Sequence, residues 1–148
     1  MRLEITRKTD LATRALLELV ASGERTKAAV LAERVGTTPG FLSQAMTPLV
    51  ARGWVRSDPG PAGGYTAVIE PGAITVLDVI EAVEGAIDTT RCVLEPRPCA
   101  DDAQCALHRP WTAARALLLA ELRRASLGDL SHQPIATRTL ADRAATER

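Results

Sequence analysis

Aromatic side chains and long hydrophobic segments are scarce in this 148-residue sequence. Aromatic residues make up 3% of it, whereas apolar residues, mostly alanine, leucine and valine, make up 46%. That balance favours packed helices over an aromatic-rich β-sandwich. No apolar run reaches the roughly 18 residues of a membrane span. The first ten residues, MRLEITRKTD, also lack the apolar segment of a signal peptide. We therefore expect a cytoplasmic, mainly helical protein.

The sequence has no net charge, with 18 basic and 18 acidic residues. A neutral chain by itself argues against nucleic-acid binding. The charges are unevenly distributed, however. Residues 1–66 contain nine Lys and Arg against six Asp and Glu, and residues 67–148 contain nine against twelve. Any nucleic-acid-binding face is therefore expected in the first half of the chain.

Cysteine is rare, and all three cysteines lie in one polar segment that ends in a histidine. An odd number of cysteines leaves one thiol over in a disulfide scheme, and nothing else suggests an oxidising compartment. The spacing C-x6-C-x5-C-x2-H is wider than that of structural zinc knuckles and suits an iron–sulfur cluster. A zinc site of three cysteines and one histidine, and free structural cysteines, are the alternatives. The candidate ligands are Cys92, Cys99, Cys105 and His108.

Two short helices joined by a glycine turn form the clearest structural pattern. The sequence predicts a helix capped by Thr26 and ended by Gly36, and a second helix capped by Thr38 and ended before Gly53. Such a pair is a helix-turn-helix, whose second helix can enter the major groove of DNA. An ordinary helical hairpin is the alternative. The small polar side chains expected to face outward, toward base edges, are Ser43, Gln44 and Thr47.

An amphipathic helix is predicted before this pair, over residues 9–22, with Thr9 or Asp10 as its cap. Arg7 and Lys8 precede it. A contact with a DNA phosphate is geometrically easy at that position, and a solvated basic helix end is the alternative.

The residues after the pair predict a β-hairpin and two more helices. WVRS and YTAVI are β-prone and flank the turn DPGPAGG, which has no basic residue; Arg56 is the nearest. A helix-turn-helix followed by a hairpin is a winged helix. Thr75 caps a helix that ends at Gly85. Pro110 begins a long helix with more apolar surface than a small domain can cover, which favours packing on a second copy.

These patterns predict a mainly α fold with a small β-hairpin. Four segments are expected: a winged helix-turn-helix DNA-binding domain over 1–85, a cluster-binding loop over 86–109, a dimerisation helix over 110–130 and a disordered tail over 131–148. No acid/base pair or nucleophile constellation occurs outside the cysteine segment, so the chain is not expected to be an enzyme.

Several motifs in this order resemble the Rrf2 family of bacterial transcription regulators. The resemblance covers residues 1 to about 130. Its motifs are FLSQ in the second helix of the pair, GPAGGY in the wing, ITVLDVIEAVEG, DTTRC before the cysteine loop, CALHRPW after it and SLGDL following the long helix.

The resemblance implies a homodimer that binds palindromic operator DNA and uses an iron–sulfur cluster as its sensor. DTTRC and CALH are most similar to members in which three cysteines and one histidine hold a two-iron, two-sulfur cluster. The segment KTDLATRALLEL is instead similar to nitric-oxide-sensing members with a four-iron cluster, in which an aspartate from the partner subunit, matching Asp10, is a ligand. The DNA-binding residues expected on this basis and on the patterns above are Arg7, Lys8, Thr38, Ser43, Gln44, Thr47, Arg56, Gly63, Gly64 and Tyr65.

The sequence departs from the family pattern at two places. Pro59 replaces the wing arginine that usually precedes the glycine-rich turn, so minor-groove insertion by that residue is lost. The gap between Cys92 and Cys99 is also one residue longer than in these relatives. Besides the cluster-sensing regulator, three readings are kept: a nitric-oxide- or iron-responsive repressor of the same family, a cluster-free DNA-binding protein that senses through its thiols, and an electron carrier.

Overall fold

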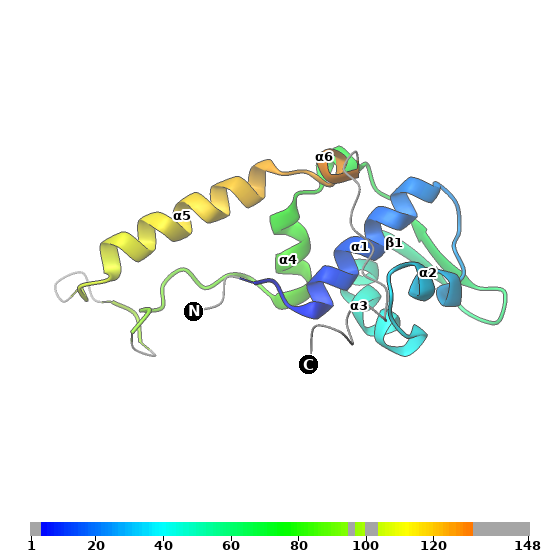
Figure 1. Cartoon of the computed structure of the whole chain (residues 1–148), viewed down its shortest axis with the longest axis horizontal. Coiled ribbons are helices and arrows are strands. Elements are labelled where there is room, and N and C mark those ends of the chain that lie inside the picture. The colour runs from blue at the N-terminus through cyan, green and yellow to red at the C-terminus, as the bar shows by residue number, and fades with distance from the viewer. Residues whose placement is uncertain (1–3, 95–96, 100–103, 132–148) are drawn as a thin grey trace.

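A computed structural model describes residues 4–94, 97–99 and 104–131. It confirms the predicted fold class, because helices dominate and a two-stranded antiparallel hairpin forms the sheet (Figure 1). Beyond Ser131, the predicted tail lies outside the described residues. In chain order the elements are α1 (Arg7–Ser22), α2 (Ala28–Arg34), α3 (Pro39–Ala51), β1 (Val55–Asp58), β2 (Gly64–Ala67), the short 3₁₀ helix η1 (Pro71–Ala73), α4 (Val76–Glu84), α5 (His108–Arg124) and α6 (Leu127–Ser131).

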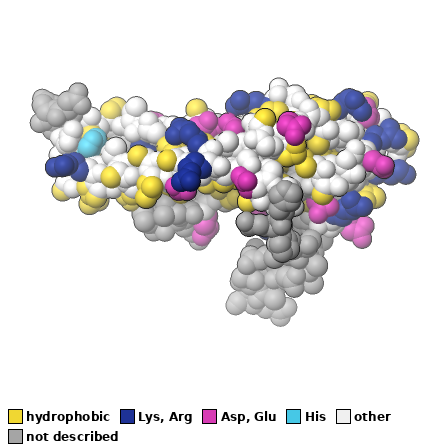
Figure 2. All heavy atoms as spheres, turned by 90° about the horizontal axis from the view of Figure 1, so that it is seen from above, with side chains coloured by type: hydrophobic (Ala, Val, Ile, Leu, Met, Phe, Trp, Pro, Cys, Tyr) yellow, Lys and Arg dark blue, Asp and Glu magenta, His cyan; other side chains and the backbone are white. Residues whose placement is uncertain are grey.

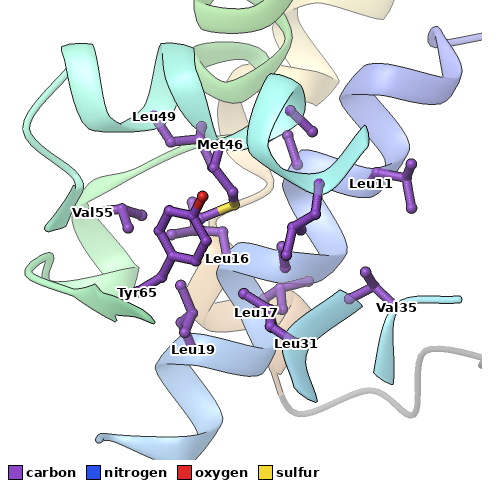
Figure 3. Close-up of a cluster of buried hydrophobic side chains, with 14 of the residues drawn as sticks. Leu11, Leu16, Leu17, Leu19, Leu31, Val35, Met46, Leu49, Val55 and Tyr65 are labelled. Atoms are coloured by element: carbon purple, nitrogen blue, oxygen red, sulfur yellow. The ribbon is translucent and has the colours of Figure 1, made fainter. Parts of the chain in front are cut away.

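The core is made mainly by α1, α2, α3 and the hairpin, to which α4 and α6 each add one buried residue. Leucines at helical spacing on α1 bury one continuous face, which packs against α3 (Figure 3). On α3, Met46 is fully buried in the core, whereas Val50 is 37% exposed. Tyr65 from the hairpin closes the core between Val55 and Leu16 (Figure 3).

Two predicted helix caps are wrong. α1 begins two residues earlier than predicted, because the Thr6 hydroxyl, and not Thr9 or Asp10, accepts from the Thr9 backbone N–H at 3.2 Å. Thr26 does not cap α2, because its backbone pairs with Tyr65 and leaves Lys27 at the cap position without a side-chain bond. The cap of α3 is as predicted, with the Thr38 hydroxyl accepting from the Phe41 N–H at 3.3 Å.

The hairpin forms the wing. β1 and β2 pair in the register Val55↔Ala67 to Asp58↔Gly64. Two glycines permit this packing. A Cβ added at Gly63 would lie 2.0 Å from the Asp58 carbonyl oxygen, and one at Gly64 would lie 2.2 Å from the Thr26 carbonyl oxygen. Any larger residue at either position would therefore displace backbone.

α4 is capped as predicted. The Thr75 hydroxyl accepts from the Asp78 N–H at 3.1 Å, and the Asp78 carboxylate accepts from the Thr75 N–H at 2.8 Å. α5 then extends away from the winged-helix body as an arm, with the cysteine segment near its far end (Figure 1). It starts at His108, two residues before the predicted start at Pro110.

The predicted helix over 110–130 is two helices. α5 ends at Arg124, and the chain returns to the winged-helix body, where the Leu127 N–H donates to the Ile74 carbonyl at 2.8 Å. α6 has its own capping box, formed by Ser126 and Asp129. Leu127 is fully buried in the core cluster. α6 therefore belongs structurally to the winged-helix core. The division of the chain into a DNA-binding domain, a cluster-binding loop and a dimerisation helix stays a prediction.

None of the described helices combines the length and the apolar character that a membrane crossing requires.

Candidate metal centre and nucleic-acid interface

The cysteine segment connects α4 to α5 and is tied to both. Asp88 opens it by accepting from the Thr90 hydroxyl at 2.7 Å and from the Thr90 N–H at 2.8 Å. These hydrogen bonds, with the charge of Arg91, hold the pKa of the Asp88 carboxyl below its ordinary value. Arg115 of α5 donates to the Thr89 carbonyl at 2.8 Å, which fastens the start of the segment to the arm. The motif DTTR therefore shapes the approach to the first cysteine.

The three thiols converge. Cys92 Sγ lies 3.6 Å from Cys105 Sγ, and Cys99 Sγ lies 3.9 Å from Cys105 Sγ. All three sulfurs lie within 4.8 Å of one another, and all three side chains are half-buried. A disulfide requires about 2.05 Å between sulfurs, so these are free thiols gathered at one point.

The convergence changes the acidity of one thiol. A backbone hydrogen bond from Cys105 lowers the pKa of Cys99. The side-chain bonds with Cys92 and Cys105, burial and the charge of Cys105 outweigh it and raise that pKa above its ordinary value. A metal must displace these protons, so its binding is favoured as the pH rises.

The structure does not bring the two candidate fourth ligands into this group. His108 is the first residue of α5, and its backbone N–H donates to the Cys105 carbonyl at 2.9 Å, but its imidazole is not among the side chains that meet within 4.8 Å. Asp10 lies in the first turn of α1, where its carboxylate forms an ion pair with Arg14 at 2.7 Å.

The donor set fits an iron–sulfur group. Thiolate sulfurs bound at about 2.3 Å around one tetrahedral metal lie about 3.8 Å apart. The Cys92–Cys105 and Cys99–Cys105 separations match that value. The same three thiolates would serve as donors to an iron–sulfur cluster or to a single zinc ion. The geometry therefore supports metal binding by the three thiols without naming the metal.

The predicted base-reading side chains are exposed on α3. Ser43, Gln44 and Thr47 all face solvent, while the opposite side of the helix is buried. The Thr47 hydroxyl donates to the Ser43 carbonyl at 2.9 Å. Thr38 is exposed at the start of the same helix, where its hydroxyl serves as the cap.

The predicted basic contacts lie at two places. Arg7, exposed at the start of α1, stacks over the Phe41 ring of α3 at 5.3 Å, and Lys8 beside it is half-buried. Arg56 is exposed on β1, with its Nε 3.8 Å from the Asp58 carboxylate. The remaining predicted positions, Gly63, Gly64 and Tyr65, are wholly or partly buried and determine the shape of the wing.

Sequence reasoning missed several residues that position these sites. The bridge between Thr26 and Tyr65 pairs the segment before α2 with the wing and brings the basic residues on either side of Thr26 next to it. Arg115 and Glu84 tie the cysteine segment and α4 to the helices around them. The repeated Ser/Thr-x-x-Asp pattern at 126–129 was a readable sequence signal for α6. The pairing of Thr26 had no such signal.

A winged helix joined through a three-cysteine segment to a protruding helix defines a class of DNA-binding regulators. The family model called Rrf2, an iron-dependent transcriptional regulator, matches residues 5–133. The chain belongs to the Rrf2 family of transcriptional regulators.

Curated relatives agree with the family. The chain is 32% identical over 130 residues to the HTH-type transcriptional regulator IscR of Klebsiella pneumoniae, an alignment that covers 86% of this chain and 79% of that protein. The IscR of Enterobacter sp. strain 638 has the same identity and coverage. These relatives are named as transcriptional regulators and not as enzymes.

Solved structures have the same fold. CymR, the global cysteine regulator of B. subtilis, superimposes with a TM-score of 0.72 at 26% identity, covering 88% of this chain and 97% of that chain. IscR of T. potens superimposes with a TM-score of 0.68 at 24% identity over 86% and 85% of the two chains, which is evidence for the fold alone.

Proposed function

We propose that this chain is a homodimeric transcriptional regulator that binds palindromic operator DNA and senses through an iron–sulfur cluster. The cluster, favoured as a two-iron, two-sulfur cluster, is held by Cys92, Cys99 and Cys105. The observation that carries this proposal is the convergence of the three thiols within 4.8 Å. A similarity to IscR over most of the chain supports it.

The proposed fourth ligand is His108, with Asp10 of the partner subunit as the alternative. His108 follows Cys105 by three residues at the start of α5, so binding through it closes only a short loop. Imidazole suits iron, and replacing a thiolate by histidine raises the potential of the cluster. Asp10 already forms an ion pair with Arg14.

The exposed surface of α5 supports the homodimer. In this 17-residue helix Leu119 is the buried residue, while Leu117 is 65% and Leu118 44% exposed. A groove of about 490 Å³ runs beside it between α4 and the segment before α1, and Ile80, Trp111 and Leu118 contribute to its lining. Apolar helix surface of this extent is typical of an interface between subunits.

The positions of the parts suggest how sensing reaches DNA. When bound, the cluster supplies a redox-active, removable charge at the far end of the α5 arm. The cysteine segment is fastened to α5 through Arg115 and continues directly from α4, which packs on α1 and α3. A rearrangement of the segment therefore changes the orientation of two winged helices in a dimer. Operator half-sites about 34–36 Å apart discriminate between such orientations.

Metal analysis of protein purified without oxygen tests the cluster. We expect a coloured protein that contains iron and acid-labile sulfide, and we expect Cys99→Ser to lose both. Ser57→Ala, on the wing, serves as the matched control and keeps them. A colourless protein after reconstitution, or one with stoichiometric zinc, would rule out the cluster.

Gel retardation tests the DNA-binding part. The probe is a set of duplexes covering the promoters nearest the gene for this chain, assayed with cluster-loaded and cluster-free protein. We expect a retarded complex whose strength differs between the two states. Replacing Ser43 or Gln44 is expected to relax base preference. No retarded complex in either state would contradict the operator proposal.

Thiol sensing without a metal is the second candidate. It is favoured by the closeness of three free thiols and by the similarity to CymR, whose structure is described as that of a cysteine regulator. A protein that contains no iron, yet loses DNA binding when a disulfide forms between Cys105 and either other cysteine, would support this candidate over the cluster. A nitric-oxide- or iron-responsive four-iron repressor is distinguished by its iron content, which would be four irons per subunit and not two.

A further inference from the structure

A third segment of the chain pairs with the two-stranded wing. On the side of β2 away from β1, the Thr26 N–H donates to the Tyr65 carbonyl at 2.9 Å, and the Tyr65 N–H donates back to the Thr26 carbonyl at 2.9 Å. On the other side, Tyr65 is opposite Ser57. β2 is therefore hydrogen-bonded on both sides, and the segment between α1 and α2 lies along an edge of the wing.

This pairing places basic residues on one face of the wing. Side chains alternate between the two faces of a sheet, and residues opposite each other share a face. Thr26 and Tyr65 point into the core, where both are buried. Their neighbours Arg25 and Lys27 therefore point to the outer face. Arg56 of β1 lies opposite Thr66 of β2, the residue after Tyr65, so it shares that outer face.

The outer face is open and positively charged. Arg25, Lys27 and Arg56 are all exposed. Asp58 shares this face and lies 3.8 Å from Arg56, so the net charge of the four residues is positive by two. Neither Arg25 nor Lys27 forms an ion pair within the described part of the chain, whereas Arg34 on α2 pairs with Glu18 at 3.8 Å. Figure 2 shows Lys and Arg side chains gathered at the end of the molecule that the wing and α2 form.

We propose that Arg25, Lys27 and Arg56 form a phosphate-binding face of the wing, which contacts the DNA backbone beside the bases read by α3. This inference rests on the DNA binding proposed above and names the side chains that supply its sequence-independent part. The hairpin turn, DPGPAGG, has no cation of its own. The contact with the DNA backbone therefore comes from the face of the sheet and not from its turn. Two of the three cations, Arg25 and Lys27, lie outside the hairpin on either side of Thr26.

The salt dependence of binding measures this contact. The probe is a fluorescein-labelled 40-base-pair duplex from the chain's own promoter region, followed by anisotropy across a potassium chloride series. Each phosphate contact contributes about −0.9 to the slope of log K against log salt concentration. We expect Arg25→Ala, Lys27→Ala and Arg56→Ala each to make the slope shallower by up to about 0.9 and to weaken binding about fivefold at 0.15 M salt. The loss is expected to be equal on a random-sequence duplex of the same length.

Matched controls separate this contact from other effects. Arg34→Ala and Arg124→Ala remove exposed arginines outside the face and are expected to leave the slope unchanged. Asp58→Asn removes the acid of the face and is expected to strengthen binding. Arg25→Lys keeps the charge and is expected to keep the slope, which guards against misfolding of the alanine variants.

Two outcomes would overturn the proposal. One is a triple variant, with all three residues changed to alanine, that binds with the wild-type slope. The other is a variant that changes base preference without changing the slope. Failure of the DNA-binding proposal itself looks different, because the wild-type protein would then bind neither duplex at any salt concentration.

Discussion

Glu84, the last residue of α4, binds Thr9 in the first turn of α1. Its carboxylate accepts from the Thr9 hydroxyl and from the Thr6 backbone N–H, the latter at 2.9 Å. Burial by itself raises the pKa of Glu84, but the hydrogen bonds from Thr9 and Thr6 outweigh burial and hold it below its ordinary value. A negative charge at the N-terminus of α1 is also favoured by the helix dipole. The contact joins the element that leads into the cysteine segment to the helix that carries Arg7.

Replacing this carboxylate is expected to destabilise the fold in a pH-dependent way. Because the folded-state pKa of Glu84 is lowered, its stabilisation is present above its ordinary pKa of 4.5 and is lost as the pH falls through the folded value. Glu84→Gln is expected to cost about 1 kcal/mol at pH 7 and to lower Tm by about 3 °C. The difference from wild type is expected to vanish in acid. Thermal unfolding from pH 7 to pH 3, with Glu24→Gln as an exposed control, measures it. An equal loss at every pH would show that the charge is not involved.

The backbone contact behind the wing gives a second prediction. A methyl group at position 64 would collide with the Thr26 carbonyl oxygen, so Gly64→Ala is expected to cost about 1–3 kcal/mol and to separate Thr26 from the wing. Gly72→Ala is the control, because a Cβ there meets nothing within 4 Å. Urea unfolding of both variants, with proton exchange at the Tyr65 amide, is the measurement. Equal stability of the two variants would contradict the close packing of the wing.

Substitutions of Leu117 on α5 and Leu127 on α6 are expected to distinguish an effect on dimerisation from an effect on folding. Leu127 of α6 is fully buried in the core, so Leu127→Ala is expected to cost about 2–5 kcal/mol. That loss should not change with protein concentration. Leu117 of α5 is 65% exposed, so the effect of Leu117→Ala acts through the dimer. It is expected to grow as the protein is diluted. Thermal unfolding at two concentrations, with sedimentation equilibrium, distinguishes the two. A Leu117→Ala variant that remains fully dimeric at every concentration would place the interface elsewhere.

The parts of the fold that follow local rules were predictable from the sequence. Thr38 with Pro39, and Thr75 with Asp78, mark helix starts by chemistry that acts within one turn. Thr26 has the same appearance, but a partner 39 residues away in sequence, Tyr65, takes its backbone groups. A threonine at a cap and a threonine in a strand cannot be distinguished without that partner.

The candidate site divides in the same way. The spacing of the cysteines predicts that they act together, and the structure brings them within 4.8 Å. The position of the His108 imidazole depends on the rotation of the first turn of α5 and on the length of the loop before it. That loop has no repeating sequence pattern, so the direction of the side chain could not be predicted. The fourth ligand is therefore determined by the orientation of that turn and not by a sequence pattern.

The last prediction concerns that ligand. His108→Ala is expected to change the cluster, shifting its visible absorption and its paramagnetic resonance spectrum, whereas Asp10→Ala is expected to leave both unchanged. The reason is distance along the chain, since His108 starts the helix that follows Cys105 directly and Asp10 must come from the partner subunit. Only neutral imidazole binds a metal, so the wild-type cluster should become more labile as the pH falls. His108→Cys is expected to keep the cluster, because it places a thiolate at the same position. If the Asp10 change alone altered the spectra, Asp10 would be the ligand, and the four-iron repressor would become the better description of this regulator.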